Sequence, residues 1–176
     1  GAYADVAVQV DRDAYVRYNG GSTVFNAPST NNLVRVDGGK LAIETYLQLP
    51  NTVFGMSCGL DRRLLQLSAV NGGELAFGSP NSYSVTFGST KGAGTTNLTV
   101  RVLADAGRLV QYASTSCSGA GRHEFVIRNG STAFFNNTIK LGNYAAATGV
   151  VSVADSTVAL GSTGGEWVLG GADAAQ

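Results

Sequence analysis

Four glutamates and one histidine are the residues of this chain that could carry acid–base chemistry. His123 is the only histidine, and it stands two residues before Phe125 in a strand-like stretch, so both side chains share one face. A glycosidase needs two carboxylates at a fixed separation, and the glutamates form no such cluster. Glu44 is the best single candidate, but we expect it to face solvent, His123 to be structural, and the protein not to be an enzyme. The glutamates are Glu44, Glu74, Glu124 and Glu166.

The cysteines and aspartates give little sign of a metal site. Cys58 and Cys117 are the only cysteines, and we expect them to form one disulfide in an oxidising compartment, with two buried free thiols as the alternative. Two distant cysteines and one histidine lack the spacing of a zinc site. Asp105, Asp155 and Asp173 lie in expected loops but stand alone, so a calcium site is not predicted. The glycine-rich stretches do not lead into a helix, and we expect no metal and no cofactor.

The charge balance excludes several classes of partner. Twelve basic residues balance twelve acidic ones, and only 14% of the 176 residues are charged, against about 25% in an average protein. No basic patch indicates nucleic acid, and no run of about 18 apolar residues indicates membrane insertion. Surfaces of low charge are typical of secreted binding modules and of subunits that pack against copies of themselves. We therefore expect a secreted or cell-surface, extracellular protein.

The elements that must position these residues are short β-strands. Residues 122–141 read as three strands separated by Asn129-Gly130 and by Asn136-Asn137, and Asn-Gly between β-prone runs is the strongest hairpin signal. A second hairpin is expected across residues 105–107. Residues 60–70 fit a helix or a strand, and their context favours a strand. About twelve short strands, no convincing helix and no convincing internal repeat together predict one all-β domain.

Three stretches in this order resemble a known family. They are residues 16–21 (VRYNGG), 39–49 (GKLAIETYLQL) and 121–130 (GRHEFVIRNG). The second is similar to the "fTIExWvk" strand, and the third to the "W-H-x-v-x-v-x-R-[DN]-G" hairpin, of the concanavalin A-like, laminin-G-like jelly rolls. The resemblance covers about residues 15–170 and implies an antiparallel two-sheet β-sandwich (jelly roll), often with a glycan-binding role. Tyr46 stands where the family usually has tryptophan.

The chain departs from this family at its two ends. The closing strand that normally follows a stretch such as residues 167–171 is missing, while residues 1–13 carry an additional strand with Val6, Val8 and Val10 on one face. We expect residues 14–176 to form the jelly roll and residues 1–13 an N-terminal extension. That strand could fill the open groove of a neighbouring subunit as a donor strand, or it could pair within its own sheet.

Two functions from different classes are compatible with these features. The first is an extracellular structural subunit that assembles with copies of itself into a fibre, sheath or coat. The second is a carbohydrate-binding or adhesion module. Aromatic side chains can offer flat faces to sugar rings, although in a sandwich they more often lie in the core. Tyr46, Tyr112 and Trp167 are the candidate glycan contacts.

Overall fold

The computed structural model describes residues 6–19, 31–44, 52–55, 63–78, 84–88, 98–118, 120–142, 147–161 and 166–169. These residues form strands and the turns between them, with no helix in the described ranges. The strands are β1 (Val6–Val10), β2 (Tyr15–Asn19), β3 (Asn31–Asp37), β4 (Lys40–Glu44), β5 (Thr52–Gly55), β6 (Arg63–Val70), β7 (Glu74–Phe77), β8 (Ser84–Gly88), β9 (Leu98–Asp105), β10 (Arg108–Gln111), β11 (Ser114–Ser118), β12 (Gly121–Arg128), β13 (Thr132–Phe135), β14 (Ile139–Leu141), β15 (Ala147–Val153), β16 (Thr157–Leu160) and β17 (Trp167–Leu169).

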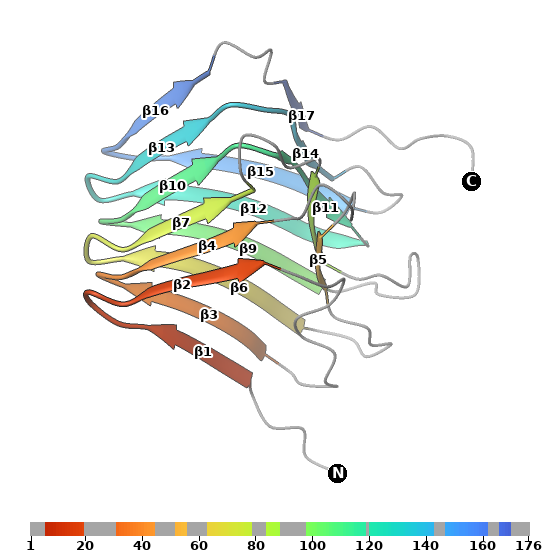
Figure 1. Cartoon of the computed structure of the whole chain (residues 1–176). Helices are drawn as coiled ribbons and strands as arrows, with labels where there is room; N and C mark the ends of the chain where they lie inside the picture. Colours follow the sequence, from red (N-terminus) through yellow and green to blue (C-terminus); the bar gives the residue numbers. More distant parts are fainter. Residues whose placement is uncertain are drawn as a thin grey trace.

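The strands form three parallel sheets. The first sheet has the order β1-β3-β6-β9-β12-β15, the second β2-β4-β7-β10-β13-β16, and the third β5-β8-β11-β14-β17. Consecutive strands belong to different sheets, so the chain winds around a common axis and each turn is one coil (Figure 1). The protein is therefore a parallel β-helix of six coils in its described part.

The predicted antiparallel jelly roll is wrong, although the prediction of an all-β chain is confirmed. Every strand pair in the described structure is parallel. Alternation along one strand shows which side chains face the core, but it does not show which other strand lies beside it. Hydrogen bonding to the preceding and following coils decided the pairing.

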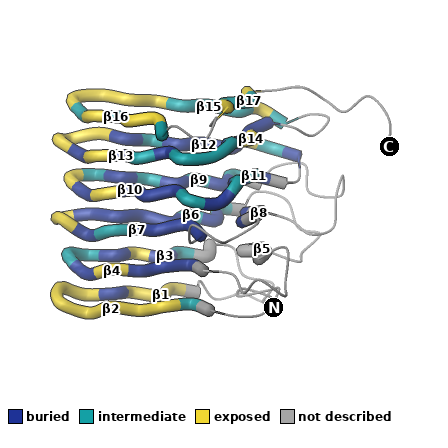
Figure 2. Tube along the Cα trace, turned by 45° about the horizontal axis from the view of Figure 1, so that its top comes forward, coloured by how far each residue is buried: buried dark blue, intermediate teal, exposed yellow. Residues whose placement is uncertain are grey.

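Inward side chains of successive coils stack in columns along the axis. One column consists of Val8, Val34, Leu67, Val102, Phe125 and Val151. Its four central members are at most 1% exposed, because each is covered by the coil before and the coil after it. The buried residues accordingly lie in the middle coils, and exposed residues dominate the first and last coils (Figure 2).

Tight corners connect the first sheet to the second sheet in every coil. We define a corner as the residues between the last inward residue of the first-sheet strand and the first residue of the second-sheet strand. The corners are residues 11–14, 37–39, 70–73, 105–107, 128–131 and 154–156. Their lengths alternate between four and three residues along the described part of the helix.

The Asn129-Gly130 turn is one of these corners, so the predicted hairpin is wrong. Asn129 (φ 57°) and Gly130 (φ 72°) do adopt the left-handed conformation that such a turn requires. The strands on either side, β12 and β13, nevertheless lie in different sheets. The hairpin expected across residues 105–107 is wrong for the same reason, because β9 and β10 also lie in different sheets.

An internal repeat does exist, contrary to the sequence-based expectation. One inward column contains Val10, Val36, Ala69, Ala104, Ile127 and Val153, so equivalent positions are separated by 23 to 35 residues. The corners vary by only one residue, and the variation therefore arises elsewhere in each coil. This irregular period hides the repeat in the sequence.

Several individual strands were predicted correctly. The ambiguous residues 60–70 include strand β6, Arg63–Val70, as favoured. Strand β11, Ser114–Ser118, consists of small polar residues that give no strand pattern in the sequence. In the described part of the chain no helix is long and apolar enough to cross a membrane.

Candidate functional site

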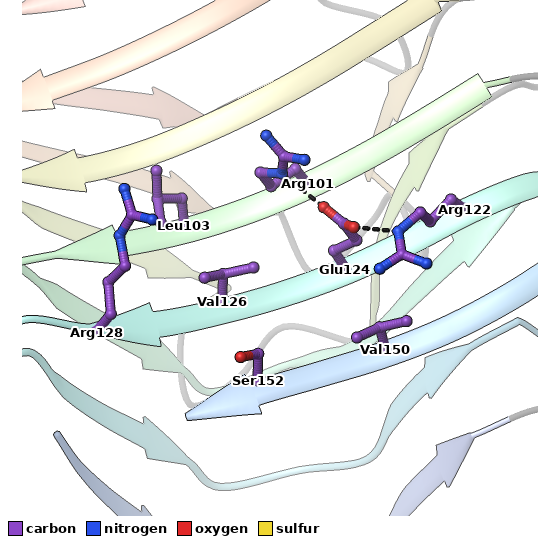
Figure 3. Close-up of a pocket in the computed structure, with 8 residues that line it drawn as sticks. All are labelled: Arg101, Leu103, Arg122, Glu124, Val126, Arg128, Val150 and Ser152. Carbon is purple, nitrogen blue, oxygen red and sulfur yellow. Dashed lines mark hydrogen bonds and ion pairs between the residues drawn. The ribbon is translucent and has the colours of Figure 1, made fainter. Parts of the chain in front are cut away.

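A hollow lies on the outer face of the first sheet, over strands β9, β12 and β15 (Figure 3). Its volume is about 380 Å³. Leu103, Val126 and Val150 are its apolar lining residues. The polar lining residues are Arg101, Arg122, Glu124, Arg128 and Ser152. Three guanidinium groups around an apolar patch make this surface complementary to an anion with an apolar body.

Glu124 is held between two arginines at one end of this hollow. Arg101 Nε donates to Glu124 Oε2 at 2.6 Å, and Arg122 Nε donates to Glu124 Oε1 (Figure 3). Burial alone would raise the pKa of the Glu124 carboxyl, but hydrogen bonds from Arg122 and Arg101 lower the pKa overall. Two cations on one carboxylate leave this end of the hollow with a net positive charge.

Arg128 lies at the other end of the hollow and belongs to a second ion pair. Its Nη2 and Nε donate to Asp105 Oδ2 at 2.6 and 2.9 Å, and Asn129 donates to Asp105 Oδ1 at 2.6 Å. The hydrogen bonds from Arg128 and Asn129 lower the pKa of Asp105. Asp105 neutralises Arg128, so the excess positive charge of the hollow lies with Arg101 and Arg122.

The outer face of the second sheet carries a charge ladder beside an apolar cluster. Lys40 Nζ lies 2.7 Å from Glu74 Oε1, and Arg108 Nη1 lies 3.1 Å from Glu74 Oε2. The cluster consists of Ala42, Ala76 and Val110, with Tyr112 and Phe134 packed against it. The candidate glycan contact Tyr112 is therefore a half-buried neighbour of this outer apolar cluster.

Core side chains are exposed at both ends of the helix. We name the end formed by β1 and β2 the N-terminal opening, and the end formed by β15, β16 and β17 the C-terminal opening. Inward-facing Val8 and Val16 are 40% and 42% exposed at the first, and Val153, Leu160 and Leu169 are 47%, 60% and 52% exposed at the second. Their counterparts in the middle coils are buried, because a middle coil has a neighbour on both sides, whereas the first and last coils have a neighbour on one side only among the described residues.

The strand expected as a donor is the first strand of its own sheet. Residues Val6–Val10 pair in parallel with residues 32–36 of β3, which confirms the alternative of pairing within the chain. Val10 is 2% exposed in the core, whereas Val8 is 40% exposed at the N-terminal opening. The side chain of Val6 lies outside the described set, although its backbone belongs to β1. The described strands form no jelly-roll groove for this strand to fill.

His123 lies fully buried in the first sheet, at an inward position of β12. Its Nδ1 accepts a hydrogen bond from the Gly142 backbone N–H at 3.1 Å. The contact ties β12 to the end of β14 in the same coil, as a structural role requires.

Two of the glutamates considered for catalysis lie elsewhere or are not described. Glu166 is exposed at the C-terminal opening, and the side chain of Glu44 lies outside the described set.

Cys117 is a free thiol in the core, 1% exposed, and burial raises its pKa. Cys58 lies outside the described residues, so the structure gives no support to the predicted disulfide.

Of the three candidate glycan contacts, Tyr46 lies outside the described residues. Trp167 packs against the core cluster, with its ring edge-on to Phe135 at 5.3 Å between centroids. The described glycan candidates, Tyr112 and Trp167, are thus not brought together.

Within the described ranges, no group of three or more histidine, cysteine, aspartate or glutamate side chains is placed to hold a metal ion. The hollow was not anticipated as a site, because Glu124 was considered only for catalysis and the arginines were not considered together. The alternating charges of residues 122–128 were the available signal.

No family model, curated protein or solved structure matches this chain. Nothing therefore identifies the chain as a concanavalin A-like protein, and the antiparallel fold which that resemblance implied is wrong.

Proposed function

We propose that this protein is a structural subunit, a rigid β-helical rod whose open ends bind copies of itself to build a fibre, sheath or coat. The observation that carries the proposal is the exposure of core side chains at both openings, with Leu160 at 60% and Val16 at 42%. Soluble repeat proteins normally close such ends with a polar capping repeat. Two apolar ends on one rod favour open-ended association.

The unpaired strand edges at the openings support the same function. Among the described strands, β1 and β15 each pair on one side only, as do β2 and β16. Exposed edges offer rows of backbone N–H and C=O groups, and proteins usually protect them with charges, proline or bulges. The outward residues of β15 are Thr148, Val150 and Ser152, none of them charged. This edge is therefore open to pairing.

An extracellular location is part of the proposal. The low fraction of charged residues, 14%, suits a surface that packs against copies of itself. Separation of cells, cell surface and medium, followed by immunoblotting, measures the location. Protein found only inside cells contradicts this part of the proposal and leaves self-assembly to be judged by the experiment below.

Sedimentation velocity and negative-stain electron microscopy over a range of concentrations test self-assembly. We expect the wild type to form rods that lengthen with concentration. Val16→Glu and Leu160→Glu each place a charge in one opening and should leave particles no longer than dimers. Thr132→Glu, on an exposed outward position of a middle coil, is the matched control and should assemble as the wild type does. A wild type that stays monomeric at all concentrations contradicts the proposal.

A second candidate function, glycan binding, is favoured by the hollow over β9, β12 and β15. Its excess positive charge suits a glycan that bears carboxylates or sulfates, with Leu103, Val126 and Val150 beneath the apolar faces of the sugar rings. Titration with a polyuronate, with a neutral glucan as comparison, tests it. Arg122→Gln should weaken binding at least about tenfold by removing a charged donor, whereas Arg108→Gln on the second sheet should not. Equal binding of both polymers contradicts this function.

A further inference from the structure

We infer that the two openings join head to tail in a single register, with β15 of one molecule beside β1 of the next and β16 beside β2. The inference rests on the proposed function and names the partner surface as the N-terminal opening of a second copy. The register continues the existing columns. Val151 stands beside the next copy's Val8, and Val153 stands beside its Val10.

The alternation of corner lengths supports this orientation. From the first coil to the last, the corners have four, three, four, three, four and three residues. A copy on the C-terminal opening presents its four-residue corner 11–14 next to the three-residue corner 154–156, so the alternation continues. A head-to-head contact instead places two four-residue corners together and makes the strands antiparallel, which occurs nowhere in the described structure.

A backbone hydrogen bond is repeated wherever a three-residue corner precedes a four-residue corner. The N–H of Gly38 donates to the Val70 carbonyl at 3.1 Å, and the N–H of Ala106 donates to the Arg128 carbonyl at 3.2 Å. Asp155 is the equivalent residue of the last corner, and its N–H has no acceptor among the residues that the structure describes. In the inferred register the acceptor is the carbonyl of Asp11 in the next copy.

Side chains also join a three-residue corner to the four-residue corner that follows it. Asn71 donates to Asp37 at 2.9 Å, and Asn129 donates to Asp105 at 2.6 Å. In both cases the donor is the second residue of the four-residue corner. The acid of the last corner is Asp155, which stands one position later than Asp37 and Asp105 do in theirs.

Arg12 is the donor that this pattern assigns to Asp155. It is the second residue of the corner 11–14, where Asn71 and Asn129 stand in the later coils. Asp11 and Asp13 flank Arg12, and Gln9 Nε2 donates to Asp11 at 2.6 Å. Arg12 is therefore the cation of this corner, and its side chain, longer than that of asparagine, pairs with Asp155 of the preceding copy.

The apolar side chains at the openings also match in this register. Leu160 stands beside the next copy's Tyr18, and Val158 stands beside its Val16, because these residues share columns of the second sheet. The junction thus covers the most exposed core residue at each opening, which is Leu160 at the C-terminal opening and Val16 at the N-terminal opening.

Disulfide cross-linking tests the register. Ser152 and Gln9 share an outward column of the first sheet, so their Cα atoms should lie about 5 Å apart across the junction, within reach of a disulfide. Both variants are made in a Cys58→Ser background, and Cys117 stays buried. We expect a mixture of Gln9→Cys and Ser152→Cys proteins to form a disulfide between positions 9 and 152, detected by peptide mass spectrometry. Each variant alone should still assemble but should give no disulfide-linked dimer.

A cysteine out of register is the control for this cross-link. Ala7 lies on the same outward face of β1 as Gln9, two residues earlier along the strand. Ala7→Cys should therefore cross-link poorly to Ser152→Cys under the same conditions. Equal cross-linking from positions 7 and 9 would contradict the single register.

A charge exchange tests the assigned ion pair. Arg12→Glu and Asp155→Lys should each raise the dissociation constant of the junction at least about tenfold, because like charges then meet there. The double variant should return to within about threefold of the wild type. Asp155→Asn tolerates the left-handed conformation at this position (φ 48°) and shows how much of the effect is due to charge.

The outcomes separate the two proposals. Rods that form without the disulfide between positions 9 and 152, or with same-variant dimers, overturn the register and leave the structural function standing. Rods whose assembly the exchange does not restore overturn the Arg12–Asp155 pair. A wild type that forms no rods removes the proposed function and the register with it. Circular dichroism of each variant shows that loss of assembly is not loss of folding.

Discussion

At the scale of single residues, ion pairs between charged side chains determine which charges remain unbalanced on the outer faces. Glu124 is mostly buried, with 7% of its side chain exposed, and the arginines at positions 101 and 122 hold it as a carboxylate. In the sequence, Glu124 was one of four glutamates considered for acid–base chemistry. In the structure it is the centre of an ion-pair triad with Arg101 and Arg122, in a hollow whose described lining contains no second carboxylate.

Glu124 should make stability depend on pH. Its pKa is lower in the folded state than the value of about 4.3 in an unfolded chain. The stabilisation is therefore present above about pH 4.3 and is lost as the pH falls through the folded pKa. We expect Glu124→Gln to cost about 1–2 kcal/mol at about pH 7 and to flatten the loss of stability on acidification, measured by urea unfolding. Glu166→Gln, at an exposed site, is the control and should retain the wild-type slope.

Two adjacent corner residues should respond in opposite directions. Ala106 has φ 51°, so Ala106→Gly should relieve strain and raise the free energy of unfolding by about 0.5–1 kcal/mol after the entropic cost of glycine. At Gly107 an added Cβ would lie 2.3 Å from the Ala69 carbonyl oxygen. Gly107→Ala should therefore cost about 3 kcal/mol or more. Chemical denaturation measures both, and equal effects would contradict the corner geometry.

At the scale of elements, the corners and columns make each strand depend on its neighbouring coils. A strand such as β6 pairs with β3 on one side and β9 on the other, and its inward residues are covered by both. Turn chemistry is local, and the Asn-Gly signal did identify a turn with positive φ. The partner of each strand lies 23 or more residues away along the column, so local chemistry could not distinguish a hairpin from a corner.

Two leucines on strand β6 should separate the inward from the outward face. Leu67 is fully buried in a column, whereas Leu64 faces outward and is half-buried. We expect Leu67→Ala to cost about 2–5 kcal/mol and Leu64→Ala less than about 1 kcal/mol. Urea midpoints measure both changes. Equal losses would mean that β6 is not held in the register described.

At the scale of the whole molecule, the described part of the helix has two apolar openings and no cap. Each coil contacts only the coils next to it, so the terminal coils gain covering only from something that continues the stack. This property belongs to the complete arrangement, because Val8 and Leu160 are ordinary core residues by type and position in their columns. Their exposure follows from their place in the first and last coils of the described structure.

Association should make thermal stability depend on protein concentration. A copy that binds only the folded state raises the apparent Tm by mass action. We expect the wild-type Tm to rise by several degrees over a hundredfold increase in concentration, measured by calorimetry. Leu160→Glu should keep its Tm constant across the same range. A wild-type Tm that does not change would show that the openings do not associate.

The sequence by itself determined the all-β class, the strand at Val6–Val10 and the conformation of the Asn129-Gly130 turn. Period-two alternation and left-handed turn residues act over a few residues, so the strand at Val6–Val10 and the Asn129-Gly130 turn could be predicted. Strand β11 could not, because its strand form comes from pairing with β8 and β14. Its own residues, Ser114–Ser118, have little apolar pattern.

Only the tertiary structure decided the direction of pairing, the repeat and the candidate sites. Parallel and antiparallel partners impose the same alternation on one strand, so the residues of β12 were equally compatible with a jelly roll and with a β-helix. The hollow joins Arg101, Glu124 and Val150 from three coils, and the openings exist only where stacking stops. Winding places these residues together through hydrogen bonds between coils, an interaction that no short stretch of sequence contains.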